Sequence, residues 1–211
     1  MDCLLDKLSC RLNRKDEQPN VELARRLFES GDTDGIREIV EGLKSPEREV
    51  ANDCIKVLYE IGSAKPELIS GYAKEFINLL RSSNNRLVWG GMTALAKIVG
   101  HSHETIFENL PEIISAYENG SVITVDNCVS VFAGLCGAGE RYAEKVLPVL
   151  LKHLANCKPK ELAQHAERAS VCFSETNAKQ FFEIFERRLE YLTPPQRTRM
   201  NKVLSRLRKY L

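Results

Sequence analysis

Hydrophobic positions along the chain follow a helical pattern that recurs at a fixed interval. Three stretches align residue for residue, and their starts lie 38 and 37 residues apart: Val50–Gly62, Val88–Gly100 and Val125–Gly137. Within each stretch the apolar residues occupy offsets 0, 4, 7, 8 and 11, which form one stripe on a helix of about 3.6 residues per turn. A repeat of this length with helical patterning predicts stacked pairs of helices, an α-solenoid.

The same frame continues toward the C-terminus. The next two positions in it are Leu162 and Arg199, which match the first three copies less well but keep the helical pattern. A second set of helices is predicted between these copies, at residues 34–44, 66–81, 104–118, 140–156 and 178–192. Each repeat is therefore a helical hairpin, and the chain as a whole is predicted to be all-α, with at least ten helices and no strand.

Glycine and proline mark the predicted ends of these helices. Each aligned copy closes on a glycine, where a residue just past a helix can adopt positive φ. Ser45-Pro46 and Thr193-Pro194 combine a capping side chain with a proline at the first helical position, whereas Lys158-Pro159 supplies the proline alone.

A recurring Leu-Pro pair links the chain to a known repeat family. Leu110-Pro111 and Leu147-Pro148 lie 37 residues apart, near the middle of two predicted first helices. A first helix with a central Leu-Pro, followed by a second helix that opens with Val and closes at Gly, resembles the HEAT repeat. The resemblance implies an α-α superhelix, a right-handed solenoid of about five helical hairpins, with the second helices lining the concave surface.

The resemblance also divides the chain. Residues 33–192 are expected to form the HEAT-like repeats. Residues 1–32 are expected to be N-terminal capping helices and a linker, with a short helix at Val21–Ser30 and an amphipathic segment carrying Leu5, Leu8 and Leu12. Residues 193–211 are expected to be a basic C-terminal capping helix that completes the last repeat, because the end units of a solenoid need a polar outer face.

The composition is typical of a folded domain and indicates where in the cell the protein is expected. Hydrophobic residues make up 43% of the 211 residues, charged residues 28%, and the net charge is +1. No apolar run approaches the roughly 20 residues of a membrane span, so a cytoplasmic protein is expected. The seven cysteines include no CxxC pair, and Cys54, Cys128, Cys136 and Cys172 fall inside amphipathic helices, which favours buried thiols over disulfides.

No catalytic motif is present, and we expect neither an enzyme nor a bound cofactor. The sequence has no phosphate-binding glycine loop, GxSxG or HExxH. The one local histidine cluster, His101-Ser102-His103-Glu104, is expected in a turn between repeats. Metal-binding HEAT enzymes of the deoxyhypusine hydroxylase type repeat a His-Glu dipeptide across opposed repeats, whereas this chain has a single such pair. No metal site is therefore predicted.

The outward positions of the second helices are the predicted binding surface. Offsets 1, 2 and 6 point away from the apolar stripe and carry Asn52, Lys56, Trp89, Asn127, Gln164 and Arg168. Aligned amides can pair with a peptide backbone along a groove, and an aromatic side chain can anchor a partner. Two alternatives stay open: the amides solvate an exposed face, and Trp89 packs between repeats.

The last segment of the chain is basic. Residues 193–211 carry no acidic residue and six basic ones: Arg197, Arg199, Lys202, Arg206, Arg208 and Lys209. Residues 1–192 carry the other 24 basic residues against 29 acidic ones, a net charge of −5. The basic helix is either a solvated cap or a phosphate-binding element. The favoured function is a non-enzymatic scaffold for a protein or peptide. The alternative is a nucleic-acid-binding protein of the HEAT-like alkylpurine DNA glycosylase type.

Overall fold

The computed structural model describes residues 3–211, and this part of the chain is all-α. The described residues form eleven α-helices and six short 3-10 helices, and no strand occurs among them, which confirms the predicted fold class. The helices are α1 Gln18–Ser30, α2 Thr33–Gly42, α3 Arg48–Ala64, α4 Ala73–Leu79, α5 Asn85–Glu108, α6 Leu110–Asn119, α7 Val122–Ala138, α8 Glu140–Asn156, α9 Pro159–Ala169, α10 Ala178–Arg188 and α11 Pro194–Leu207. None of the helices in the described part is long and apolar enough to cross a membrane.

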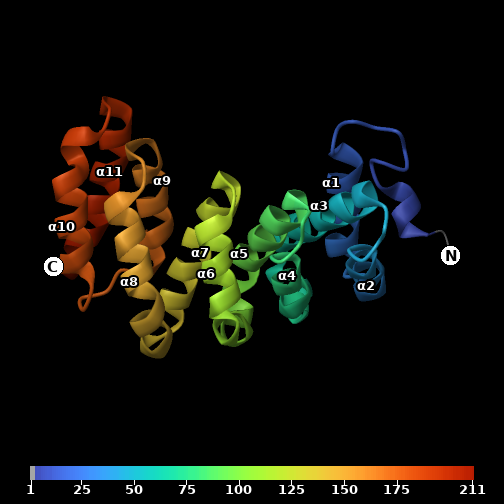
Figure 1. Cartoon of the computed structure of the whole chain (residues 1–211), viewed down its shortest axis with the longest axis horizontal. Helices are drawn as coiled ribbons and strands as arrows, with labels where there is room; N and C mark the ends of the chain where they lie inside the picture. Colours follow the sequence, from blue (N-terminus) through green and yellow to red (C-terminus); the bar gives the residue numbers. More distant parts are fainter. Residues whose placement is uncertain (1–2) are drawn as a thin grey trace. The chain divides into compact units, whose positions relative to one another are not determined.

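The chain forms two compact units that meet within α7, the first ending at Cys128 and the second beginning at Val129. In the first unit α1, α3 and α5 pack side by side, while α2 covers α3 and α4 covers α5 (Figure 1). In the second unit α9 packs beside α11 and α8 beside α10, and the pairs α8–α9 and α10–α11 are also in contact. Each unit is thus two layers of helices. The predicted boundaries at residues 32 and 192 stay predictions.

The apolar stripe is the core of these layers. In α3 the stripe residues Val50, Cys54, Val57, Leu58 and Ile61 are at most 2% exposed. Each large apolar side chain buried in this way stabilises the fold by about 1.5–3 kcal/mol. The corresponding residues of α5 and α7 are also buried, apart from Val88, Ala96 and Val125, which are half-buried.

The predicted C-terminal glycines are inside helices, which is a correction. Gly62, Gly100 and Gly137 lie within α3, α5 and α7, and the positive-φ glycines of the described chain are Gly31 and Gly139. Packing accounts for glycine at position 62, since a Cβ there would stand 2.8 Å from Ile69 Cδ1. Gly62 therefore marks a position of close packing against Ile69 and not the end of a helix.

Two predicted first helices are broken. The segment predicted as one helix at 66–81 consists of two 3-10 turns, Pro66–Leu68 and Ser70–Tyr72, followed by α4. Pro111 lies in the first turn of α6, where its missing N–H costs nothing, because α5 ends at Glu108. Pro148 lies inside α8 as predicted.

The histidine cluster spans a kink within α5, at the place where a turn between repeats was predicted. α5 continues past Gly100 to Glu108 and bends at Ser102, whose φ and ψ are −129° and 25°. Ser102 Oγ donates a hydrogen bond of 2.8 Å to Ser70 O. The second helix of one repeat is therefore continuous with the start of the next, with no loop between them.

Helix starts show mixed agreement with the capping signals. Thr193 precedes α11, which begins at Pro194, and Gln196 Oε1 accepts a hydrogen bond of 2.9 Å from Thr193 N, as a capping box requires. α3, by contrast, begins at Arg48, two residues later than Ser45-Pro46 predicts. The N-terminal helix α1 begins at Gln18, earlier than predicted, and Leu12 is 50% exposed.

Candidate functional site

The candidate site begins with one face of α3. Asn52, Lys56 and Glu60 recur every four residues and so share a face of α3, on which all three are half-buried. Lys56 Nζ lies 2.6 Å from Glu60 Oε1 and 3.2 Å from Glu17 Oε2. The Lys56 side chain is only 12% exposed. This lysine is therefore held in place by two carboxylates.

α5 adds a cation and an aromatic ring to the same face. The Arg86 guanidinium lies 4.5 Å from the centre of the Trp89 ring, and Trp89 lies 6.1 Å from the Tyr59 ring of α3. Arg86 also forms an ion pair with Glu17. We call these side chains the Glu17 cluster; its members are Glu17, Lys56, Tyr59, Glu60, Arg86 and Trp89.

The charges of the cluster support one another. Burial raises the pKa of Glu17, but Arg86 and Lys56 more than offset this, and the net pKa lies below the usual value. Burial lowers the pKa of Lys56, but its contacts with Glu60, Tyr59 and Glu17 outweigh this and the net pKa is raised. At neutral pH the cluster therefore holds two positive and two negative charges beside two aromatic rings.

The predicted amides link neighbouring repeats. Asn52 Oδ1 accepts a hydrogen bond of 2.8 Å from Asn84 Nδ2, at the start of α5. Asn127 Nδ2 donates to Thr93 Oγ1 and to Ile123 O, both at 3.0 Å. Both asparagines are half-buried. The amides are thus fixed in orientation by bonds along the stack of helices.

The second unit contains the other two predicted residues. Gln164 and Arg168 lie one turn apart on α9 and are half-buried. Arg168 Nη1 donates a hydrogen bond of 2.8 Å to Ser130 Oγ of α7. The same kind of bond, between second helices of neighbouring repeats, therefore occurs in both units.

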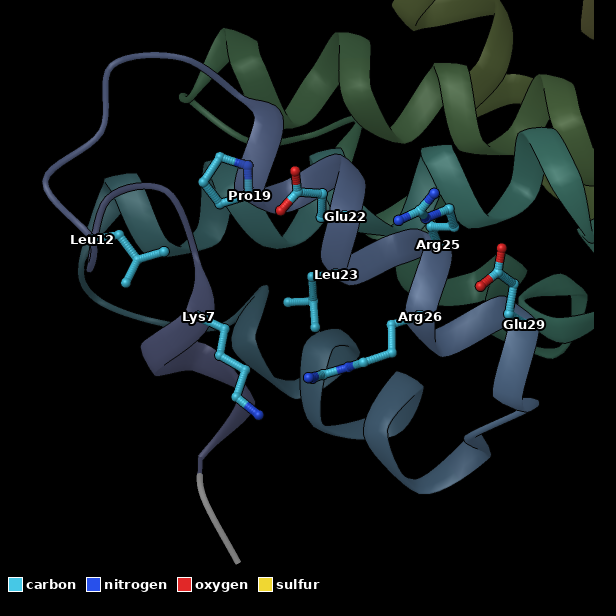
Figure 2. Close-up of a pocket in the computed structure, with 8 residues that line it drawn as sticks. All are labelled: Lys7, Leu12, Pro19, Glu22, Leu23, Arg25, Arg26 and Glu29. Atoms are coloured by element: carbon cyan, nitrogen blue, oxygen red, sulfur yellow. The ribbon is translucent and has the colours of Figure 1, made fainter.

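Two hollows flank α1 and the segment before it. A polar pocket of about 480 Å³ adjoins the Glu17 cluster and is lined by Ser9, Cys10, Asn13, Arg14, Lys15, Asp16, Glu17, Glu49, Asn52, Asp53 and Arg86. The second hollow, of about 440 Å³, lies between Lys7, Leu12 and α1, where Figure 2 shows Glu22, Arg25, Arg26 and Glu29 along the helix. Its charges are mixed and its side chains mostly exposed, as expected for the outer face of a cap. The first hollow is the one continuous with predicted site residues.

The basic C-terminal helix α11 contributes both an ion pair and buried side chains to the second unit. Arg199 Nε donates a hydrogen bond of 3.0 Å to Glu167 Oε1 of α9. Arg197, Lys202, Arg206, Arg208 and Lys209 are exposed. The opposite side of α11 buries Met200, Val203, Leu204 and Leu207. This helix is therefore a packed part of the second unit as well as a charged surface.

Sequence reasoning overlooked four members of the Glu17 cluster: Glu17, Tyr59, Glu60 and Arg86. Glu17 falls in a segment read as a linker, outside the repeat, so no periodic signal marks it. Tyr59 and Arg86 lie at offsets 9 and −2 of the aligned frame, which the search for outward positions did not include. Contacts between neighbouring repeats would have identified them, and these depend on the stacking geometry.

No family model matches the chain, and no curated protein matches its sequence. Solved structures are similar in fold. A computationally designed armadillo repeat protein for modular peptide recognition covers 90% of this chain and 89% of its own, at 14% identity and a TM-score of 0.67. A designed armadillo repeat protein in complex with the peptide (KR)4 covers 96% and 99%, at 16% identity and a TM-score of 0.68.

A natural protein has the same fold over part of its length. Kap121p, solved bound to Pho4p, matches 99% of this chain at 14% identity and a TM-score of 0.71, and the match spans 23% of Kap121p. At these identities the similarity establishes the fold alone. The chain is an all-α helical repeat solenoid.

Proposed function

We propose that the chain is a non-enzymatic, cytoplasmic HEAT-like scaffold that binds a protein or peptide partner along its second helices. The observation that carries the proposal is the Glu17 cluster, in which Lys56, Arg86 and Trp89 are held half-buried on one face. The proposed contact residues are the six expected from the sequence together with Arg86: Asn52, Lys56, Arg86, Trp89, Asn127, Gln164 and Arg168. That these residues form one continuous strip stays a prediction.

Physical chemistry favours this face over the rest of the molecule. Tryptophan, tyrosine and arginine dominate the binding energy of protein interfaces. Side chains already held by ion pairs and ring contacts lose little conformational entropy when a partner binds, so more of the contact energy appears as affinity. Peptide and protein ligands in the similar structures, (KR)4 and Pho4p, support a scaffold role for this fold.

The partner is to be identified by affinity capture with chemical cross-linking, and the contact surface by variants. We expect Arg86→Ala with Trp89→Ala, or Asn127→Ala with Arg168→Ala, to abolish capture of the cross-linked partner. The matched control is Lys74→Ala, which removes an exposed charge from α4 in the other layer of helices. Far-UV circular dichroism of each variant should show unchanged helix content.

The alternative to be tested is that the partner binds to the exposed basic side chains of α11. Deleting residues 193–211 would remove α11 and uncover the sides of α9 and α10 against which it packs, so the test replaces exposed charges only. Arg197→Gln with Lys202→Gln and Arg208→Gln should leave partner capture intact. If capture is lost in this triple variant and persists in the Arg86/Trp89 variant, the basic helix is the binding element and the proposed surface is wrong.

A further inference from the structure

Three potential metal ligands meet where α8 turns into α9. His153 lies in the last turn of α8, Cys157 follows the end of that helix, and His165 lies in α9. One ligand atom of each residue lies within 4.8 Å of the others. His153 is 7% exposed, His165 is 1% exposed and Cys157 is half-buried. All three belong to the second compact unit.

The two imidazoles already have nearly the separation that a shared ion requires. His153 Nε2 and His165 Nδ1 lie 2.9 Å apart, as hydrogen-bonded neighbours. Two nitrogens bound to one tetrahedral zinc ion at about 2.0–2.1 Å stand roughly 3.3 Å apart. The rings therefore need to separate by a few tenths of an ångström. The cysteine sulfur must approach by about 1 Å, since a zinc-bound sulfur lies roughly 3.6 Å from a zinc-bound nitrogen.

The chain path brings the ligands together. His153 and Cys157 are four residues apart and share one side of α8, and the Lys158-Pro159 turn then returns the chain so that His165 faces them. The C-terminal end of a helix carries partial negative charge, which favours a cation there. Nitrogen and sulfur ligands select zinc among the common divalent ions, whereas magnesium and calcium require oxygen.

Arg188 organises the same corner from α10. Its Nη1 donates a hydrogen bond of 2.7 Å to Leu154 O and lies 3.6 Å from Cys157 Sγ. The guanidinium therefore fixes the end of α8 and places a positive charge beside the sulfur, where it would neutralise a metal-bound thiolate. Buried imidazoles need polar partners; here His153 and His165 pair with each other, and a bound ion would take the place of that hydrogen bond.

We propose that His153, Cys157 and His165 bind one zinc ion, with water as the fourth ligand. The ion joins α8 to α9 and so stabilises the second unit. It is independent of the partner surface proposed above, which rests on different side chains.

The test adds ZnCl₂ or CoCl₂ to chelator-treated full-length protein. We expect one equivalent of zinc by calorimetry and native mass spectrometry, and a zinc-dependent rise in melting temperature. Cobalt should give intense tetrahedral d–d absorption together with a thiolate-to-cobalt charge-transfer band. Absence of a zinc equivalent, or a cobalt complex without the charge-transfer band, would overturn the assignment.

Variants separate this site from surface binding. Cys157→Ser should lower zinc affinity by at least about a hundred-fold, remove the charge-transfer band and abolish the zinc-dependent rise in melting temperature. His165→Gln should have the same three effects. If this substitution of a buried residue impairs folding, the Cys157→Ser variant alone decides the test. The matched control combines Cys3→Ser with His101→Gln, both at exposed positions, and should bind zinc as the unaltered protein does. Binding that survives Cys157→Ser but is lost in the control would refute the proposal.

Discussion

At the scale of the residue, Glu17 shows how one carboxylate outside the repeat pattern can join two repeats. It precedes α1 and pairs with Lys56 of α3 and with Arg86 of α5. Lys56 and Arg86 are each less than a third exposed, so water screens these pairs less than it screens ordinary surface ion pairs. The N-terminal segment is in this way attached to the first two aligned helices.

This attachment should depend on pH. Because the pKa of Glu17 in the folded protein lies below its usual value of 4.5, its stabilising effect is complete above that pH. The effect is lost as pH falls through the lower, folded-state pKa. Glu17→Gln should therefore lower the free energy of unfolding at pH 7, and the difference from the unaltered protein should shrink below pH 4.5. Urea titrations across this range measure it.

The control for Glu17 is Glu29→Gln, on the exposed side of α1. It should change the free energy of unfolding by no more than about 0.5 kcal/mol. A Glu17→Gln effect of constant size from pH 7 down to the acid limit would show that the ion pairs are not its cause.

The core stripe makes a second prediction at this scale. Val129 is fully buried in α7, so Val129→Asp places a charge among apolar side chains. We expect a loss of about 3–5 kcal/mol in the free energy of unfolding, measured by thermal or urea denaturation. An unchanged melting temperature would mean that the repeat frame is wrong.

At the scale of the element, α5 contains glycines with different environments. A Cβ at Gly91 would stand 2.9 Å from Phe76 O and 3.1 Å from Leu79 Cβ of α4, whereas a Cβ at Gly100 would meet nothing within 4 Å. Glycine at position 91 thus permits α4 to approach α5. Glycine at position 100 serves no packing purpose in the described structure.

The pair gives a matched comparison within one helix. Gly91→Ala should destabilise the protein by about 1–3 kcal/mol, because the backbone carbonyl cannot move away without shifting α4. Gly100→Ala should stabilise it by about 0.5–1 kcal/mol through the higher helix propensity of alanine. Urea denaturation of both variants measures the difference, and equal effects would contradict the packing argument.

The elements also show how far sequence reasoning reaches. Helix existence and the buried face follow from the apolar period, and the prediction of α8 at Glu140–Asn156 agrees at both ends. Helix ends were less predictable, because Gly62 and Pro111 serve packing and a helix start, respectively. The proximity of His153 to His165 was not predicted either, since it depends on how α8 and α9 pack.

At the scale of the whole molecule, the chain divides into two compact units, each with buried aromatic side chains of its own. The second unit contains a group of aromatic rings, Phe173, Phe181 and Phe185, whose centres lie 4.9–6.3 Å apart. The single tryptophan, Trp89, lies in the first unit. In repeat proteins each unit depends mainly on its immediate neighbours, so a local change need not affect the whole array equally.

Phe181→Ala should therefore separate two unfolding transitions. Because the Phe181 ring is fully buried, its removal should lower the free energy of unfolding of the second unit by about 3–5 kcal/mol. We expect far-UV circular dichroism to begin its transition at lower urea, while Trp89 fluorescence shifts much less. Coincident shifts of both signals would show that the units unfold as one.

The bend of α5 at Ser102 has a consequence for how this chain can diversify and be cut. Only Ser102 departs from helical backbone at that boundary, and its hydroxyl is bonded to Ser70 O, so a protease finds little extended backbone to cleave there and an inserted segment would break this contact. The non-helical backbone at residues 8–16 and 173–177 imposes no such restriction. Limited proteolysis and tolerated insertions should therefore concentrate in those two segments and spare the boundary at Ser102.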